Sequence, residues 1–502
     1  MKTESRPDAE EGGLLTADGT KPGSYTLEDS FPESNLEKGI VGWDGQKDPK
    51  NPRNFSKGRK WSILGFVSLM SFLSPLASSM FAPGVQFMDA SFHNESEVLS
   101  SLVVSIFLLG YVFGPLVLSP LSEIYGRRLV LFTANSIFVV WQIGCAKAPS
   151  LASLIVFRLL AGIGGSGCLT IGGGIIGDLF APTERGAAMA AFSIGPLVGP
   201  VIGPIAGGFL SQQVSWRWVF WVLLIASGTA TLGIEVFNTE TNPEVIIQKK
   251  TKLLAKQTNR PDLRSCYEQG VSLTSFEIIK RGILVPITLL FATPISFILS
   301  LYMSLVYGLL YLLFTTITGI YEVTYGWSPE LCGLAYLGIG LGFFVGLGIV
   351  AKSNDKTVVT LTRSNDGVYE PEMRLAACGI FALFIPISFF WYGWAVEKHA
   401  HWVVPIIGMI PFGFGMIGVF IPIQTYMVDA FPKYAASAVA ALTAMRSLFG
   451  AFLPLAGPQM YTTLGYGWGN SLLGFISVAL LPVPYLIYKF GGYLRKKHPL
   501  NL

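Results

Sequence analysis

Two arginines stand alone inside long apolar runs of this sequence. Arg158 lies in the run near residues 151–177, and Arg446 lies in another near residues 434–457. A guanidinium surrounded by apolar residues is costly, and it normally faces a protein interior or a water-filled cavity, where it binds an anion or stabilises an ionised carboxylate. Arg158 is therefore a candidate functional residue. Arg446 is a second candidate, with structural pairing as the alternative.

Charged residues also gather where apolar runs end. Glu123 is followed, after a glycine, by Arg127 and Arg128. The Glu123 carboxylate can pair with Arg127 or face the positive N-terminus of a neighbouring helix. Such an ion pair can hold two parts of a protein together in one conformation and break in another; simple anchoring by the two arginines is the alternative. Asp178 and Asp429 also lie where runs end, and each is either a gating group or a solvated cap charge.

Small and polar residues recur in other apolar runs. Between residues 195 and 208, glycines stand at every fourth position and three prolines form a second stripe. A glycine stripe lets another helix approach closely, and prolines remove backbone donors and permit bending. The candidates for substrate contact are Tyr302, Tyr307, Gln424 and Tyr426. A tyrosine combines an apolar ring with a polar tip, although helix packing is the alternative for these residues.

The elements that position these residues follow from composition. The chain has 502 residues, of which 51% are hydrophobic and 13% are charged, whereas a soluble domain has about 25% charged residues. So much apolar surface requires lipid as its solvent. A helix of about 20 residues crosses the ~30 Å of bilayer hydrocarbon. Twelve apolar runs reach this length, near residues 61–83, 98–120, 128–147, 151–177, 187–210, 217–237, 287–318, 329–351, 375–396, 402–428, 434–457 and 468–490.

These runs predict an all-α membrane protein with twelve transmembrane helices in two pseudo-symmetric six-helix bundles. The expected parts are a largely disordered cytoplasmic tail (1–60), an N-terminal bundle (61–237), a central cytoplasmic loop (238–280), a C-terminal bundle (281–490) and a cytoplasmic tail (491–502). Lysine and arginine gather in one set of loops, which predicts that both termini are cytoplasmic. Asn94 begins a sequon that then lies outside the cell, as a candidate glycosylation site.

The sequence argues against several classes of function. Its four histidines and five cysteines have neither metal-ligand spacing nor a CxxC motif. A phosphate-binding Gly-x-x-x-x-Gly-Lys motif is absent, which argues against ATP-driven transport. We expect no enzyme activity, no metal and no nucleic-acid partner. No cofactor is expected either.

One motif resembles that of the major facilitator superfamily. The loop between the second and third spans of that family has a Gly-x-Leu-x-Asp-Arg-x-Gly-Arg-Arg pattern. The chain matches it at Leu121, Glu123, Gly126, Arg127 and Arg128, and departs from it at Ser119 and Ile124. The form with Pro-Leu-Ser-Glu before the glycine looks like the fungal branch of drug:proton antiporters with twelve spans.

Two further motifs extend this resemblance. Arg158 matches an Arg-x-x-x-Gly element of the fourth span, which the family associates with proton coupling. The antiporter motif of the fifth span is matched at Gly199, Gly203, Pro204, Gly207 and Gly208. Segments similar to the fungal branch also occur at 43–61, 216–221, 371–375, 424–429 and 446–450. The resemblance thus covers most of the chain.

The resemblance implies a proton-coupled secondary transporter that exports small amphipathic compounds, such as drugs, antifungals or self-made toxic secondary metabolites. It implies alternating access in the plasma membrane, with a monomer as the functional unit. The alternative is a facilitator or proton symporter that takes up a nutrient such as a sugar or a polyamine. The glycine and proline pattern of the fifth span argues against uptake, because the family associates it with exporters.

Overall fold

The computed structural model describes residues 31–268, 274–431 and 434–497, and most of these residues are helical. Eleven helical stretches in this part of the chain are long and apolar enough to cross a membrane. The last one, Ala435–Arg495, has 61 residues, which is about twice the length that one crossing needs. Gly465 interrupts it with a φ of 72°, so this stretch supplies two crossings. The total is then twelve, as the sequence predicts.

The N-terminal half contains the first six crossings. They are α1 (Lys57–Ser79), continued by η2 (Ala82–Gly84) and α2 (Val85–Phe92), then α3 (Glu97–Tyr125), α4 (Arg127–Ala146), α5 (Leu151–Leu179), α6 (Pro182–Gln213) and α7 (Trp216–Phe237). Serines cap several helix starts: Ser96 accepts a hydrogen bond from the Leu99 amide, and Ser150 forms a capping box with Ser153. Gly126, with a φ of 99°, separates α3 from α4 and lets the chain reverse.

The C-terminal half begins with α9 (Ser275–Ala292), before the predicted bundle start at residue 281. Thr274 and Glu277 form a capping box that sets the earlier start. The crossings that follow are α10 (Pro294–Tyr325), α11 (Pro329–Cys332) with η3 (Gly333–Tyr336) and α12 (Leu337–Ser364), η4 (Pro371–Leu375) with α13 (Cys378–Ala382) and α14 (Phe384–Glu397), α15 (Val403–Gly408) with α16 (Ile410–Ala430), and α17 (Ala435–Phe452) with η6 (Leu453–Ala456), α18 (Gly457–Leu480) and α19 (Pro482–Lys497).

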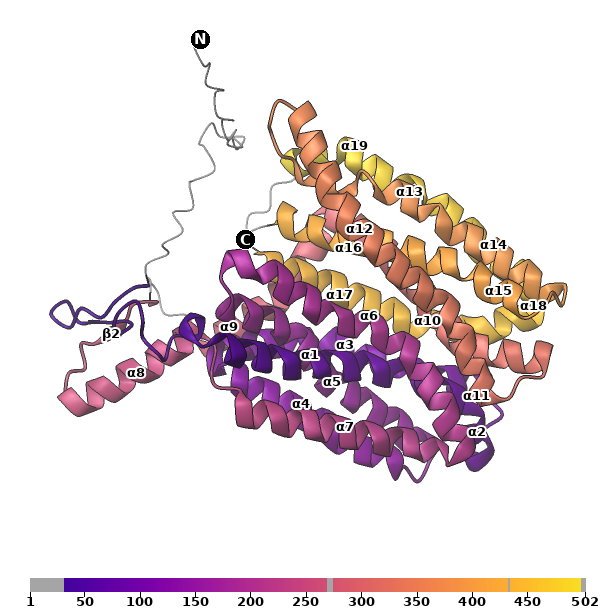
Figure 1. The fold of residues 1–502 in the computed structure, drawn as a ribbon, viewed down its shortest axis with the longest axis horizontal. Coiled ribbons are helices and arrows are strands. Elements are labelled where there is room, and N and C mark those ends of the chain that lie inside the picture. The colour runs from indigo at the N-terminus through magenta and orange to yellow at the C-terminus, as the bar shows by residue number, and fades with distance from the viewer. Residues whose placement is uncertain (1–30, 269–273, 432–433, 498–502) are drawn as a thin grey trace, which may run out of the picture.

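Packing follows the same plan in the two halves. In the N-terminal half, α5 packs against α3 and α4, α6 against α1, and α7 against α4. In the C-terminal half, α16 packs against α12 and α14, α17 against α10, and α18 against α14. Each helix pair in one half therefore has its counterpart in the other, as an internal duplication requires. Figure 1 shows the halves as two groups of helices, coloured indigo to magenta and orange to yellow.

The halves meet along two seams. At one seam, α3 packs against α17; at the other, α6 packs against α11 and η3. The second span thus packs against the eleventh, and the fifth packs against the eighth. The two seams are equivalent, because the eighth and eleventh spans are the counterparts of the second and fifth. A pair of related seams of this kind allows the halves to rock against each other about their common axis.

Part of the predicted tail and loop is ordered. Residues 1–30 lie outside the described residues, but β1 (Ile40–Val41) pairs in parallel with β2 (Arg264–Ser265) of the central loop. The loop also contains α8 (Pro243–Thr258), and η1 (Pro52–Asn54) leads from the paired segment into α1. Figure 1 shows α8 and β2 beside the end of the bundle opposite α2 and α11. The expectation of disorder therefore does not hold for residues 31–60.

A small core explains this order. Trp43 is 1% exposed, and its indole Nε1 donates a hydrogen bond to Tyr267 Oη at 3.0 Å. Lys250 on α8 forms an ion pair of 2.6 Å with Asp44 and donates to the Gly42 carbonyl at 2.7 Å. A buried aromatic ring and partners more than 200 residues away thus stabilise a segment whose composition alone predicts disorder.

Candidate functional site

Arg158 is held in the interior of the N-terminal half by backbone carbonyls. The residue is 2% exposed. Its Nε donates to Val103 O at 2.6 Å, and its Nη2 donates to Val104 O and Ser78 O, each at 3.2 Å. Nη1 lies 3.5 Å from Ala77 O. The guanidinium therefore joins α5 to α3 and to the last turn of α1, where helix carbonyls have no intrahelical partner and carry partial negative charge.

Aromatic rings complete the surroundings of Arg158. Its guanidinium carbon lies 5.4 Å from the ring centroids of Phe81 and Phe107 and 5.9 Å from that of Phe220. No carboxylate within the described residues forms an ion pair with it. This arrangement favours a structural tie between three helices over a role in which Arg158 acts on a nearby acid.

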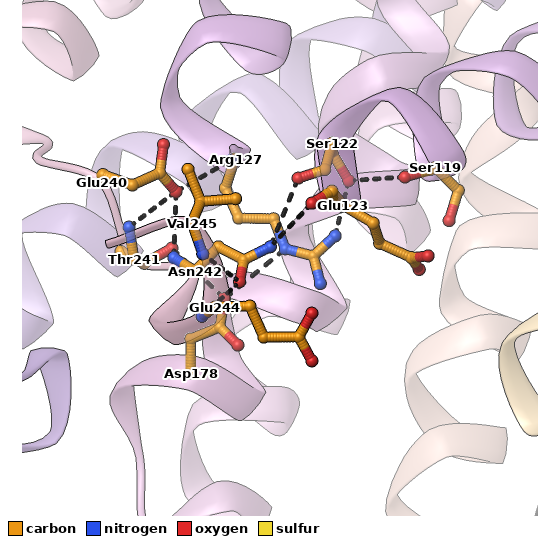
Figure 2. Close-up of polar contacts among 10 residues, drawn as sticks. All are labelled: Ser119, Ser122, Glu123, Arg127, Asp178, Glu240, Thr241, Asn242, Glu244 and Val245. Atoms are coloured by element: carbon orange, nitrogen blue, oxygen red, sulfur yellow. Dashed lines mark hydrogen bonds and ion pairs between the residues drawn. The ribbon is translucent and has the colours of Figure 1, made fainter. Parts of the chain in front are cut away.

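A charged cluster lies at the end of the N-terminal half from which α8 starts, and Figure 2 shows it in close-up. Arg127 Nε lies 3.5 Å from Asp178 Oδ2, and Arg127 Nη1 donates to Ser122 Oγ at 2.5 Å. Glu240 Oε1 accepts hydrogen bonds from the backbone amides of Arg127, Thr241 and Asn242 at 2.8, 3.0 and 2.9 Å. The cluster therefore joins α3, α4, α5 and the segment that follows α7.

Glu123 does not form the ion pair with Arg127 that its spacing suggests. Figure 2 shows the Glu123 carboxylate directed away from the Arg127 guanidinium, whose Nη1 donates to Ser122 Oγ and whose Nε lies 3.5 Å from Asp178 Oδ2. The reason is the turn at Gly126: its φ of 99° reverses the chain, so that Arg127 starts α4 and lies over Gly174 of α5. Arg128 pairs with Glu235 near the end of α7. These ion pairs lie within one half.

The C-terminal half has a matching set of ion pairs. Arg374 Nε lies 3.0 Å from Asp429 Oδ2, which also accepts a hydrogen bond from Tyr369 Oη at 2.5 Å. Burial and the adjacent carboxylate raise the pKa of Tyr369 to about 12, so this phenol stays protonated and donates. Glu372, which is 3% exposed, pairs with Arg495 at 3.1 Å.

These two sets occupy equivalent places in the duplicated fold. Arg127 and Asp178 join the start of the third span to the end of the fourth, and Arg374 and Asp429 join the ninth to the tenth. Arg128 on the third span pairs with Glu235 on the sixth, and at the equivalent place Glu372 on the ninth span pairs with Arg495 on the twelfth. The positions of the positive and negative charges are therefore exchanged between the two halves. The loop after the eighth span has only a degenerate copy of the Gly-Arg-Arg motif, so sequence analysis missed Arg374, Glu372 and Arg495. A comparison of the ninth, tenth and twelfth spans with the third, fourth and sixth could have identified them.

The glycine stripe of α6 packs against α1. A Cβ atom added at Gly199 would lie 2.8 Å from Phe72 O, and one at Gly203 would lie 2.5 Å from Ser79 Oγ. A Cβ atom at Gly207 would overlap the Met80 carbonyl. These contacts join the first and fifth spans of one half, as close helix packing predicts.

The C-terminal end of α6 forms a seam with the C-terminal half. A Cβ atom at Gly208 would lie 2.6 Å from Pro329 O of α11, and the Pro204 carbonyl lies beside Gly333 of η3. Gln213 Nε2 donates to Glu330 Oε2 at 2.7 Å, and the Glu330 amide donates to Gln212 Oε1 at 3.0 Å. The residues predicted for the antiporter helix thus serve both packing within a half and contact between halves.

The predicted substrate-contact residues lie in three different places. Tyr302 is 3% exposed within the packed core of α10, and Tyr426 is fully buried, with its Oη 3.5 Å from Glu372 Oε1 in the ion-pair set of the C-terminal half. Tyr307 lies beneath Arg446, with its ring centroid 5.1 Å from the guanidinium carbon. Gln424 is partly buried on α16, one turn from Phe420, whose ring also packs on Arg446 at 4.8 Å.

Further hydroxyl groups connect this region. Tyr311 of α10 hydrogen-bonds to Ser78 of α1 at 2.8 Å, which links the two halves near their centre. Tyr111 of α3 hydrogen-bonds to Ser74 at 2.6 Å, and Ser74 donates to the Gly165 carbonyl at 2.7 Å. Residue type alone gave no signal for Tyr111, Ser74 and Ser78, because serine and tyrosine are common in apolar helices.

A cavity of about 450 Å³ lies between the halves at the end of the bundle that carries α2. Residues of α2 and α3 line it on one side, and residues of α10 and α18 line it on the other; they include Asp89, Glu97, Ser100, Thr315, Tyr461 and Tyr466. The sequon asparagine lies beside it. Asn94 Nδ2 donates to Asp89 Oδ1 at 2.7 Å, to Ser100 Oγ at 3.0 Å and to Ser96 O at 3.2 Å. The amide that would accept a glycan is therefore already used in the loop.

Comparison with known proteins agrees with this architecture. The family model described as Major Facilitator Superfamily matches residues 67–454. The chain belongs to the major facilitator superfamily. As a member of this superfamily, it is a multi-pass membrane transporter of small molecules and not an enzyme.

Fungal members of the superfamily are similar over nearly the whole chain. The MFS transporter cpaT of Aspergillus oryzae is 48% identical, over 91% of this chain and 91% of the relative. The MFS-type transporter penM of Penicillium rubens is 47% identical, over 94% and 93%. The efflux pump radE of Floropilus chiversii is 41% identical, over 97% and 90%.

Solved structures share the major facilitator fold. A partially occluded inward-open form of the xylose transporter XylE from E. coli matches with a TM-score of 0.63 at 16% identity, over 86% of this chain and 98% of XylE. A bacterial homologue of the lysosomal transporter Spinster matches with a TM-score of 0.59 at 17% identity, over 89% and 100%. The predicted fold class and family are confirmed.

Proposed function

We propose that this major facilitator protein exports small amphipathic compounds across the plasma membrane in exchange for protons. Its cargo would be drugs, antifungals or self-made toxic secondary metabolites. The observation that carries the proposal is the likeness, over nearly the full length, to fungal transporters that include the efflux pump radE. The glycine and proline stripe of α6, which resembles the antiporter motif of the family, supports the outward direction.

Alternating access follows from the two seams between the halves. Substrate binds between the halves near Tyr307 and Gln424, on helices that the duplicated fold brings to the centre. The outer seam opens when Gln212 and Gln213 release Glu330, which breaks one hydrogen bond to the Glu330 carboxylate and one between two neutral amide groups. Rocking of the halves then exposes the centre to the other side of the membrane.

Proton coupling is assigned to the cytoplasmic carboxylates rather than to Arg158. Asp178 and Asp429 each face an arginine at the inner end of a helix, and each is partly buried. Protonation of either carboxylate removes its attraction for the arginine and frees that arginine to move. Arg128 and Glu123 then serve the cytoplasmic gate as fixed charges near this switch.

The orientation proposed from the sequence places both termini in the cytoplasm. Arg127, Arg128, Arg374 and the ordered segment before α1 lie at the same end of the bundle, which then carries most of the positive charge. A single chain contains both halves, so we propose a monomer as the transporting unit. The glycan expected at Asn94 would break the hydrogen bonds of its amide.

The experiment is energised efflux from cells. The chain is expressed in a yeast that lacks its own drug pumps, and the cells are loaded with fluorescent amphipathic dyes. We expect dye to leave faster than from control cells carrying Asp178→Asn, and a protonophore should abolish the difference. Faster dye entry that does not respond to the protonophore would identify a facilitator for uptake and would contradict the proposal.

A further inference from the structure

Arg446 differs from Arg158 in the number of hydrogen-bond partners that its guanidinium N–H groups have. Both are arginines in apolar helices, but Arg158 donates to four backbone carbonyls. Arg446 Nε and Nη1 are buried atoms for which the described residues supply no hydrogen-bond partner. These two nitrogens carry most of the N–H groups of the guanidinium. The fold thus satisfies four of the five N–H groups of Arg158, whereas two of the three nitrogens of Arg446 have no partner among the described residues.

The surroundings of Arg446 contain aromatic groups in place of an anion. Its guanidinium carbon lies 5.1 Å from the ring centroid of Tyr307 and 4.8 Å from that of Phe420. The titratable groups that interact with it electrostatically are Tyr307, Tyr311 and Tyr111, and no carboxylate of the described residues is among them. Cation–π contact lowers the cost of the buried charge but leaves the N–H edges unsatisfied.

The position of Arg446 suits a transported ligand. The residue lies 11 positions into α17, which begins at Ala435, and this corresponds to a rise of about 16 Å. That depth is near the middle of the ~30 Å hydrocarbon layer. One turn further on, a Cβ atom added at Gly450 would lie 2.7 Å from Leu108 of the N-terminal half and 3.2 Å from Tyr307 of the C-terminal half. Arg446 therefore lies where α17 contacts both halves, at the depth where transporters of this architecture bind substrate.

We propose that Arg446 is the anchor for an anionic group of the cargo, such as a carboxylate, an enolate or a phenolate on an apolar or aromatic skeleton. The guanidinium supplies charge-assisted hydrogen bonds to that group. The rings of Tyr307 and Phe420 supply flat apolar walls for the skeleton. This inference rests on the proposed transport function and names the chemical class of its substrate: weak organic acids in their ionised form.

A matched pair of probes tests the charge alone. 1-Naphthaleneacetate and 1-naphthaleneacetamide share ring and size, and at neutral pH only the first is ionised. Binding of each labelled probe to the purified full-length chain is measured by equilibrium dialysis. The acid should bind more tightly than the amide by roughly 10- to 100-fold, the range expected for hydrogen bonds to a charged group. Arg446→Gln should remove this preference, and Arg446→Lys should keep part of it, because lysine keeps the charge without the planar fork.

Thermal unfolding without ligand supplies a second, independent readout. An unpaired buried cation destabilises a fold, so Arg446→Met should unfold at a higher temperature than the wild-type chain. Arg363→Met removes an exposed arginine and serves as the control, with no change in stability or in probe preference. The acid should raise the unfolding temperature of the wild-type chain but not that of Arg446→Met.

The outcomes separate this proposal from the proposed function. Equal binding of acid and amide, or binding of neither, contradicts the role of Arg446, and so does a fall in stability on Arg446→Met. Those results would leave dye export intact. Conversely, anion binding at Arg446 in a chain that moves dye inward would support the anchor and overturn export.

Discussion

Substitution of Arg158 by lysine separates a structural tie from a coupling charge. Lysine keeps the positive charge, but its compact ammonium cannot reach acceptors on both α1 and α3 as the guanidinium does. Arg158 makes three hydrogen bonds of 3.2 Å or less and one of 3.5 Å. Side-chain hydrogen bonds in membrane helices contribute about 0.6 kcal/mol on average and about 1.7 kcal/mol at most. Loss of two or three of them predicts a destabilisation of about 1 to 5 kcal/mol.

The chain carries its own reporter for this loss. Cys145, Cys168, Cys332 and Cys378 are buried, so a thiol-reactive fluorophore labels them only as the fold opens. We expect Arg158→Lys to be labelled at a lower temperature than the wild-type chain, and Arg363→Lys, at an exposed site, to behave as wild type. Efflux per folded molecule should stay sensitive to a protonophore. A variant as stable as wild type that has lost this sensitivity would refute the structural account and make Arg158 a coupling charge.

Three other substitutions test separate parts of the structure. Asp178→Asn removes an ion pair whose partners are largely buried, so it should cost about 1 to 2 kcal/mol and make dye efflux insensitive to a protonophore; efflux that still follows the gradient would contradict its role. Gly207→Ala should destabilise the chain by about 1 to 3 kcal/mol because the added methyl overlaps a carbonyl, whereas Gly173→Ala, with open space around it, should not; equal thiol labelling of the two would be the opposing result. Trp43→Ala should speed trypsin cleavage within 259–268 while leaving the unfolding temperature of the transmembrane helices unchanged, and unchanged cleavage would show that this residue does not hold the segment.

Periodicity and hydropathy predicted the membrane part of the fold well, because a span must be long and apolar whatever it packs against. Order in residues 31–60 could not be predicted in this way, since it depends on pairing of two-residue strands far apart in the chain. The partner of Arg127 was missed for a similar reason: Glu123 is near in sequence, but the turn at Gly126 directs the arginine to Asp178.

The two intramembrane arginines show a second limit of sequence reasoning. Arg158 and Arg446 have the same residue type and similar apolar neighbours, and the resemblance to a known motif favoured Arg158 as the functional one. Their difference lies in whether nearby carbonyls are free to accept hydrogen bonds, as they are at the end of α1. Whether such carbonyls are free depends on where a neighbouring helix ends. The residues around the arginine in the sequence carry no information about that.

Transport by the purified chain in proteoliposomes tests proton-coupled export most directly. Vesicles with the cytoplasmic face of the protein outward are given an acidic lumen, and an amphipathic dye is added at equal concentration on both sides. The account predicts that dye accumulates in the lumen while protons leave it, and that Asp178→Asn abolishes both fluxes. Dye that only equilibrates, with no proton flux and no response to the gradient, would contradict it.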